Sequence, residues 1–243
     1  MGPIALHGGG EFLPGDEPSV DALLEAARRL DRPETRIVVL PTAAARGRPD
    51  RAAATAVAFF EQRAHAAGLA ASVRVALVIH AASANDPANA LLVESADLVV
   101  FLGGDPDLIP DLLRGTLTEN ALRRVWTHGA AVSGASAGAM ALAEWSWTPH
   151  GGMPGLGFVA GIAVVPHYDD IRRLAWQSSL GHVAPAGLGY LGLDERTGVI
   201  SDEDGWQVAG EGAAYWFAAG SSFPIVARHG DRLTLPRRPS PLT

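Results

Sequence analysis

The stretch "AAVSGASAGAMALAEW" covers residues 130–145 and joins two different local patterns. Residues 130–135 form an apolar run typical of a buried strand, and the residues from Ser136 onward have the pattern of a helix. Glycine and alanine surround the serine, so the chain has room for a tight turn that lifts the Ser136 hydroxyl above a sheet. The stretch therefore predicts a strand–turn–helix unit, from which parallel α/β sheets are built.

Strand-like and helix-like segments alternate on both sides of this unit. Near-continuous apolar strands between helices favour an α/β fold with a mostly parallel sheet and helices on both faces. After about Gly151 the strands become short and glycine-rich, which we interpret as continuation of the sheet with a small antiparallel C-terminal extension, within one domain of residues 1–243. The other predicted strands are 3–7, 36–41, 72–80, 97–102, 161–166, 190–194, 198–201, 206–210 and 213–220. The other predicted helices are 19–30, 50–68, 86–96, a broken stretch over 105–114 and 118–129, and one around 171–180.

The composition narrows the classes of protein to which the chain can belong. With 48% hydrophobic and 19% charged residues, the 243 residues can bury a sizeable core. The net charge is −7 and basic residues never cluster beyond two, so nucleic acid and anionic membrane surfaces are poor partners. No apolar run reaches the length of a transmembrane helix, and we expect a cytoplasmic protein.

Two residue types are missing, and their absence limits the chemistry. Without cysteine there is no disulfide, no thiolate metal site and no cysteine nucleophile. Without lysine there is no Schiff base, no Ser–Lys dyad and no P-loop lysine. Covalent catalysis in this chain would therefore use serine or threonine.

The motif at 134–138 is G-x-S-x-G between a strand and a helix, which is the context of a nucleophile elbow. In such an elbow the serine is exposed, and the N–H of Ala137 lies at a helix N-terminus where it can stabilise an oxyanion. The alternative is an ordinary tight turn built from small residues.

A nucleophilic serine needs a base, and the carboxyl ends of parallel strands meet at the same edge of a sheet. Three of the eight histidines follow strand-like runs: His7, His80 and His167. Each is a candidate base, with a structural role as the alternative. We interpret His65 and His229 as solvated or structural.

Two glycine-rich stretches also follow strands, "HGGGEF" at 7–12 and "FLGGDPD" at 101–107. Their backbone amides can complete an oxyanion hole or hold a phosphate. We assign Gly9, Gly10 and Asp105 to substrate binding on this basis. A third stretch, "GLGYLG" at 187–192, matches G-x-G-x-x-G only formally, because no helix follows it.

Several segments together resemble the peptidase S51 family, which includes dipeptidase E and cyanophycinase. They are "ALHGGGEF", "FLGGDPDLIPDLLRGT", "GASAGAMAL", "GLGFVAGIAVVPHYDD" and "GLGYLGLDERTGVI", in this order. The resemblance implies a flavodoxin-like fold related to class I glutamine amidotransferases. It also implies that Ser136 is the nucleophile and His167 the general base, with Gly104 and Ala137 as oxyanion donors.

The resemblance nominates Glu195, in "GLDE", as the acid that orients His167. Asp169, two residues after the histidine, is the alternative acid. Glu144 falls two turns into the predicted elbow helix, about 12 Å along its axis, which is too far to reach. Arg172 and Arg173 are candidates to bind a substrate carboxylate, with a solvated helix face as the alternative.

The leading hypothesis is thus a serine peptidase that cleaves a small peptide or isopeptide through an acyl-enzyme, with a bond next to an acidic residue as a candidate target. It implies no metal and no organic cofactor, and it is compatible with a homodimer. Two alternatives stay open. One is a catalytically silent domain that binds a ligand or a partner, and the other is a serine esterase or amidase with a non-peptide substrate.

Overall fold

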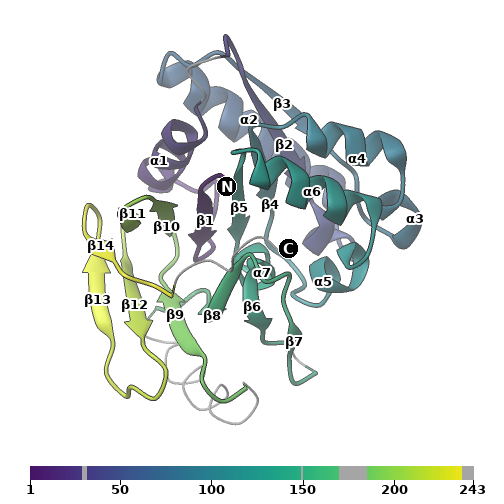
Figure 1. The fold of residues 1–243 in the computed structure, drawn as a ribbon. Helices are drawn as coiled ribbons and strands as arrows, with labels where there is room; N and C mark the ends of the chain where they lie inside the picture. The colour runs from purple at the N-terminus through teal and green to yellow at the C-terminus, as the bar shows by residue number, and fades with distance from the viewer. Residues whose placement is uncertain (29–31, 149, 170–184, 237–243) are drawn as a thin grey trace.

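The structure is a computed structural model that describes residues 1–28, 32–148, 150–169 and 185–236. Within these ranges the chain forms two β-sheets with helices packed around the first of them (Figure 1). The helix that the sequence predicts around 171–180 lies outside the described residues. The predicted mixed α/β architecture is confirmed, and the first sheet is parallel in its central part.

The first sheet has a parallel half and an antiparallel half that meet at β1. Strands β1, β5, β4, β2 and β3 pair in parallel, whereas β10, β11 and β14 pair antiparallel on the other side of β1. The strand order is β14 (Arg232–Leu233), β11 (Gly205–Gly210), β10 (Thr197–Asp202), β1 (Ile4–His7), β5 (Ala131–Ala135), β4 (Leu98–Phe101), β2 (Thr35–Leu40) and β3 (Ala71–Val75).

Successive residues of the central strands point into two different cores. In β2, Ile37 and Val39 pack with α1 (Glu17–Ala27) and α2 (Pro49–Ala66). Val38 and Leu40 point to the other face, where the remaining helices cover the sheet. This alternation is the two-residue period of a strand, and it explains why these strands are apolar on both faces. The helices on the second face are α3 (Ala81–Ala84), α4 (Pro87–Glu94), α5 (Leu108–Leu113), α6 (Leu117–Thr127) and α7 (Ala137–Leu142).

The second sheet corrects the prediction that the chain after Gly151 continues the first sheet and adds a small antiparallel extension to it. Strands β6, β8 and β9 pair in parallel, and β7, β12 and β13 pair antiparallel at the two sides. Of the later strands, only β10, β11 and β14 extend the first sheet. The order is β13 (Ile225–Arg228), β12 (Ala213–Phe217), β9 (Gly189–Leu193), β8 (Val159–Val165), β6 (Ala143–Ser146) and β7 (Met153–Pro154).

The reason for the second sheet is the early end of α7. The sequence predicts a helix through residue 145, but α7 ends at Leu142 and the chain continues as β6. Backbone N–H groups of the 155–157 segment bond to the carbonyls of Ala141, Ala143 and Glu144, which in a longer helix would accept from the next turn. Glu144 is therefore on a strand, and its carboxylate accepts the N–H of Gly161 at 2.6 Å.

The third strand is also shorter than predicted. The predicted strand covers 72–80, but β3 ends at Val75, and the last bond to β2 comes from the N–H of Ala76. His80 instead caps the short helix α3, because its Nδ1 accepts the N–H of Ser83 at 3.0 Å. A 3₁₀ turn, η1 (Thr42–Ala44), follows β2.

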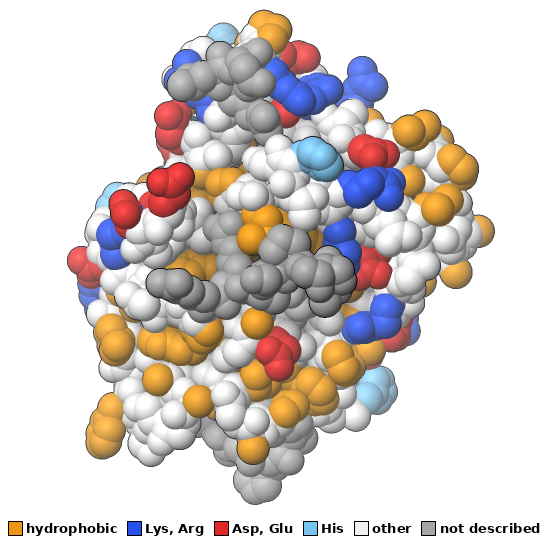
Figure 2. All heavy atoms as spheres, in the orientation of Figure 1, with side chains coloured by type: hydrophobic (Ala, Val, Ile, Leu, Met, Phe, Trp, Pro, Cys, Tyr) orange, Lys and Arg blue, Asp and Glu red, His pale blue; other side chains and the backbone are white. Residues whose placement is uncertain are grey.

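Charged side chains of both signs lie interspersed on the face drawn in Figure 2, and hydrophobic side chains gather over the region of β12 and β13. Phe223, Ile225 and Val226 are among the exposed large hydrophobic residues of this region. In the described ranges, no helix combines the length and hydropathy needed to cross a membrane.

Gly138 offers a test of the packing between α7 and the first sheet. A Cβ at this position would lie 2.7 Å from the carbonyl oxygen of Phe101, inside the shortest real contacts. We expect Gly138→Ala to lower the free energy of unfolding by about 1–3 kcal/mol, although alanine favours helices. In the control, Gly47→Ala, the nearest atom is 3.5 Å away, and stability should change by less than about 1 kcal/mol. Urea unfolding measures both, and a Gly138→Ala protein as stable as wild type contradicts this packing.

Candidate active site

Ser136 lies where β5 ends and α7 begins, in a backbone conformation that is rare for a residue with a side chain. Its φ is 50° and its ψ is −113°, and its N–H donates to the carbonyl of His7 at 2.9 Å. Such a conformation costs about 1–3 kcal/mol and persists only where the surrounding structure enforces it. The predicted strand–turn–helix at 130–138 is thus present, with the serine in a strained turn.

A chain of two hydrogen bonds leads from Ser136 to a carboxylate. The Oγ of Ser136 is 2.9 Å from Nε2 of His167, and Nδ1 of His167 is 2.7 Å from Oε1 of Glu195. An ionised carboxylate only accepts hydrogen bonds, so Nδ1 carries the proton and Nε2 accepts from the serine hydroxyl. Both His167 and Glu195 are partly exposed, so a substrate can approach them.

These three residues come from both sheets. Ser136 follows β5 of the first sheet, while His167 and Glu195 follow β8 and β9 of the second. The site therefore lies along the junction of the two sheets. The structure brings together the three side chains that the resemblance nominated, and their catalytic roles remain a proposal.

Three consecutive carbonyl groups, beginning at the last residue of β1, hold this arrangement in place. The carbonyls of residues 7, 8 and 9 accept, in that order, the N–H groups of Ser136, His167 and Arg196, at 2.9, 2.8 and 2.7 Å. Arg196 directly follows Glu195. One short segment of main chain thus fixes the backbone beside each member of the hydrogen-bonded chain.

The backbone strain of the described residues is concentrated at this site. Four residues other than glycine have positive φ there, with values of 65°, 50°, 52° and 54° for Phe12, Ser136, His167 and Arg196. Three of them are the residues bonded to the carbonyls of 7–9, and the N–H of Phe12 bonds to the carboxylate of Asp16 at 2.9 Å. Each of these strained residues is therefore held by a hydrogen bond from its backbone N–H to a residue between 7 and 16.

Gly9 and Gly10 face the histidine and the glutamate with their α-carbons. A Cβ at Gly9 would lie 2.2 Å from Cε1 of His167, and one at Gly10 would lie 3.1 Å from Cβ of Glu195. Both glycines also have positive φ, 102° and 69°. Close packing accounts for these glycines, and the substrate-binding role assigned to them stays a prediction.

The two predicted oxyanion donors come from the turn after β4 and from the start of α7. Gly104 has φ 148° and packs against the carbonyl of Ala43, while Ala137 is the first residue of α7. Within the part of the chain that the structure describes, neither N–H has a hydrogen-bond acceptor. The neighbouring Gly103 lies close to Ser136, since a Cβ built on it would be 3.2 Å from that of the serine.

Asp105 takes part in a turn beside these glycines. Its Oδ1 accepts the N–H of Asp107 at 3.1 Å, and its Oδ2 is 2.5 Å from the guanidinium of Arg46. These contacts hold the 103–107 turn, and the substrate-binding role of Asp105 stays a prediction. Arg172 and Arg173 lie outside the described residues.

The other histidines considered as bases have different partners. The imidazole of His7 is bonded to Asp16 and Gly9, and that of His80 caps α3. His65 is exposed on α2, and Nδ1 of His229 accepts the N–H of Gly210 at 3.3 Å. The position beside the serine hydroxyl is occupied by His167.

The two other candidate acids are placed differently from Glu195. Asp169 and Glu195 both line an open cavity of about 620 Å³, with Glu195 on Nδ1 of His167. Glu144 is on β6, where its carboxylate bonds to Gly161. The prediction that Glu144 lies on a helix is wrong, because α7 ends at Leu142 and does not reach this residue.

One carboxylate near the serine was not found from the sequence. Oε1 of Glu11 accepts the N–H of Gly103 at 3.0 Å, directly beside Ser136. The signal was present, because Glu11 follows a strand end on the same edge of the sheet, within the "HGGGEF" stretch. We interpreted that stretch only through its backbone amides.

Comparison with known proteins now assigns the chain to a family. The model of one family, Peptidase family S51, matches residues 4–208. The chain belongs to peptidase family S51. A crystal structure of a peptidase from an acI-B1 Actinobacterium is similar to this S51 chain, with 25% identity, 97% of each chain covered and a TM-score of 0.80.

A second structure, described as a putative peptidase E protein from Listeria monocytogenes EGD-e, has 12% identity and a TM-score of 0.59. It covers 87% of this S51 chain and 99% of its own, and at this identity the likeness concerns the fold alone. A search of curated proteins found no match. Family membership together with the structural likeness to peptidases supports a peptidase activity.

Gly9→Ala tests the close packing behind His167. Because the new methyl group would overlap Cε1, we expect the imidazole to move and the Ser136 Oγ–His167 Nε2 distance to exceed 3.5 Å, the limit of a hydrogen bond here. Crystallography of the variant measures this distance.

The matched control is Gly230→Ala, since Gly230 also has positive φ (86°) but no atom within 4 Å of a new Cβ. It should strain the backbone equally and leave the distance at the site unchanged. An unchanged distance in Gly9→Ala would show that the imidazole does not depend on this packing.

Proposed function

We propose that this S51 chain is a serine peptidase that hydrolyses a peptide or isopeptide bond through an acyl-enzyme on Ser136. The observation that carries the proposal is the continuous hydrogen-bonded chain from Ser136 Oγ through both nitrogens of His167 to Glu195. The strained serine at a strand–helix turn supports it, because strain of this kind exposes a nucleophile.

In the acylation step, Ser136 Oγ attacks the scissile carbonyl carbon and its proton passes to Nε2 of His167. The resulting imidazolium is stabilised by the carboxylate of Glu195, which also keeps the ring in the required tautomer. The tetrahedral oxyanion accepts hydrogen bonds from the N–H groups of Gly104 and Ala137. Collapse of this intermediate breaks the C–N bond, and His167 gives its proton to the leaving amine.

In the deacylation step, water takes the place of the amine. His167 removes a proton from the water, whose oxygen attacks the ester carbonyl on Ser136. The second tetrahedral intermediate collapses to a carboxylic acid product, and the proton on Nε2 returns to the serine oxygen. Both steps use the same five groups, and the reaction needs no further reactant than water.

We propose Gly9, Gly10, Asp105, Arg172 and Arg173 as substrate-binding residues, and a bond next to an acidic residue as the target. The two arginines can bind a substrate carboxylate with paired N–H groups. We propose that the protein acts as a soluble peptidase in the cytoplasm and that it forms a homodimer.

The nucleophile is tested with a fluorophosphonate probe, which reacts covalently with activated serines. We expect wild-type protein to be labelled and Ser136→Ala to remain unlabelled, with a melting temperature close to wild type because only one oxygen is removed. Mass spectrometry of the labelled peptide locates the adduct.

Each alternative hypothesis has its own outcome in this experiment. Intact wild-type protein that is not labelled favours a catalytically silent binding domain. Labelling at Ser136 with turnover of esters or amides but of no peptide favours the esterase or amidase. Peptide hydrolysis by purified Ser136→Ala would exclude Ser136 as the nucleophile.

The acid is tested by three isosteric substitutions. We expect Glu195→Gln to lower kcat by up to about 10⁴-fold, because an amide at this place favours the wrong tautomer of His167. Asp169→Asn should lose far less. Glu144→Gln should stay near wild type, since its amide oxygen can still accept the N–H of Gly161. Full turnover in Glu195→Gln with a collapse in Asp169→Asn would assign the acid to Asp169.

A further inference from the structure

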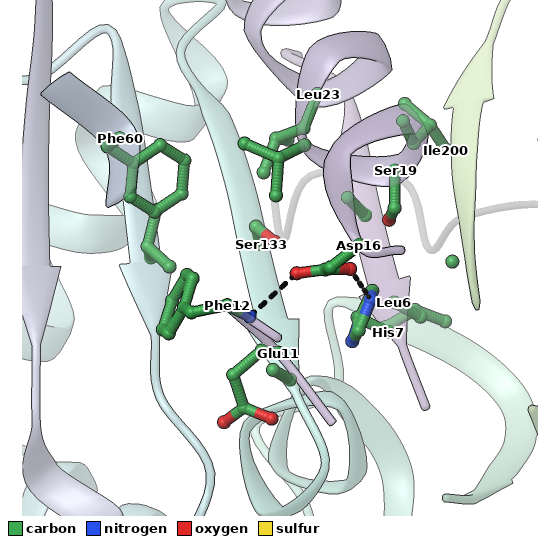
Figure 3. Close-up of a pocket in the computed structure, with 15 residues that line it drawn as sticks. Leu6, His7, Glu11, Phe12, Asp16, Ser19, Leu23, Phe60, Ser133 and Ile200 are labelled. Carbon is green, nitrogen blue, oxygen red and sulfur yellow. Dashed lines mark hydrogen bonds and ion pairs between the residues drawn. The ribbon is translucent and has the colours of Figure 1, made fainter. Parts of the chain in front are cut away.

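A second histidine–carboxylate pair is buried directly beneath the site. Nε2 of His7 is 2.7 Å from Oδ1 of Asp16, and the two residues are only 8% and 0% exposed (Figure 3). The pair has no part in the proton transfers proposed for Ser136. Burying a carboxylate is costly, and this one contacts no substrate in the proposed reaction. Its presence therefore needs another explanation.

Every polar side-chain atom of the pair makes a hydrogen bond. The two atoms that do not bond within the pair accept N–H groups of the loop after β1. Oδ2 of Asp16 accepts the N–H of Phe12 at 2.9 Å, and Nδ1 of His7 accepts the N–H of Gly9 at 3.1 Å. Since Nδ1 accepts, the ring proton is on Nε2 and is donated to Asp16. Figure 3 shows Asp16 between Phe12 and His7, with both bonds drawn.

Asp16 occupies the N-cap position of α1, yet its carboxylate makes no hydrogen bond to that helix. Both oxygens face the loop instead. The side chain therefore does not serve as a helix cap, which is the usual reason for an aspartate at this position.

The loop held by this pair is the one that fixes the site. Its carbonyls at residues 7–9 bind the backbone of Ser136, His167 and Arg196, and its Glu11 binds Gly103. Gly9 is at once the residue whose N–H is held by His7 and the residue that packs on Cε1 of His167. A displacement of Gly9 therefore reaches the imidazole directly.

We propose that His7 and Asp16 are positioning residues for the reaction at Ser136: they hold the segment of residues 7–12 so that its carbonyls keep the three strained residues in register. The inference rests on the proposed function of Ser136, but its structural part can be measured separately. In catalysis, a displacement of about 1 Å can cost about 100-fold in rate, so a small loss of order here has a large effect.

The decisive variant is Asp16→Asn, which replaces one acceptor oxygen by an NH₂ group facing either Phe12 or His7. We expect its first-order rate of fluorophosphonate labelling at saturation to fall about 10- to 100-fold, with the half-saturating probe concentration unchanged. A substrate would show the same division, with a lower kcat and an unchanged KM.

Asp97→Asn is the matched control. Asp97 is only 1% exposed and accepts N–H groups from Arg36 and Arg32, but it precedes β4 and so lies at the opposite edge of the sheet. This variant should lose at least as much stability as Asp16→Asn and keep the wild-type labelling rate. Equal losses of labelling rate in the two variants would reduce the effect to general destabilisation and overturn the proposal, as would a wild-type rate in Asp16→Asn.

A second pair of variants covers the case in which Asp16→Asn does not fold. In His7→Asn an amide oxygen can replace Nδ1 as the acceptor for Gly9, whereas His7→Leu offers no acceptor. We expect His7→Asn to label at least tenfold faster than His7→Leu. Equal rates would show that the bond to Gly9 has no influence on the site.

Amide hydrogen exchange separates failure of this inference from failure of the proposed function. In Asp16→Asn the amides of Gly9, Ser136, His167 and Arg196 should exchange at least tenfold faster than in Asp97→Asn. This result is expected even if wild-type protein does not react with the probe. That lack of reaction would reject the proposed serine peptidase but not the positioning role of His7 and Asp16. Unchanged exchange of these four amides in a folded Asp16→Asn protein rejects the positioning role.

Discussion

The site depends on hydrogen bonds between main-chain atoms more than on any side chain. The carbonyls of residues 7–9 hold the backbone of Ser136, His167 and Arg196, and each of these three residues has a conformation that an L-amino acid normally avoids. A strained residue relaxes unless its neighbours prevent it. Because one continuous segment restrains all three, the distances between Oγ, Nε2 and the Glu195 carboxylate are set together. Side chains complete the chemistry, but their relative positions follow from this segment of backbone.

The local parts of this arrangement could be predicted from the sequence. The elbow at Ser136 needs small neighbours and a strand before it, and both requirements appear within a few residues of the serine. The choice of His167 over His7 and His80 could not be made in this way, because all three follow apolar runs; the family resemblance separated them. The end of α7 at Leu142 was missed since it depends on pairing with residues 155–157, which no local propensity encodes. For the same reason the second sheet was not foreseen.

His7 illustrates how burial changes the role that a residue can have. From the sequence it was a candidate base, and its position at the end of β1 is as close to Ser136 in the backbone as the prediction required. What the sequence could not show is Asp16, whose Oδ1 lies 2.7 Å from Nε2 of the ring and occupies that nitrogen. In a medium of low dielectric constant such a pair is costly to break, and fully satisfied polar networks of this kind specify one arrangement of the chain. Two chemically similar pairs, His7–Asp16 and His167–Glu195, thus differ in burial: the first is almost completely buried, and the second is partly exposed.

The position of the nucleophile between the two sheets has a consequence for how the protein acquires its native state. Ser136 belongs to the first sheet, whereas His167 and Glu195 follow strands of the second, and α7 connects the two sheets with six residues. A species in which only the first sheet has assembled contains the elbow but has no base beside it. The acquisition of nucleophilic reactivity at Ser136 therefore marks the docking of the two sheets, an event that spectroscopic signals of helix and strand content do not resolve.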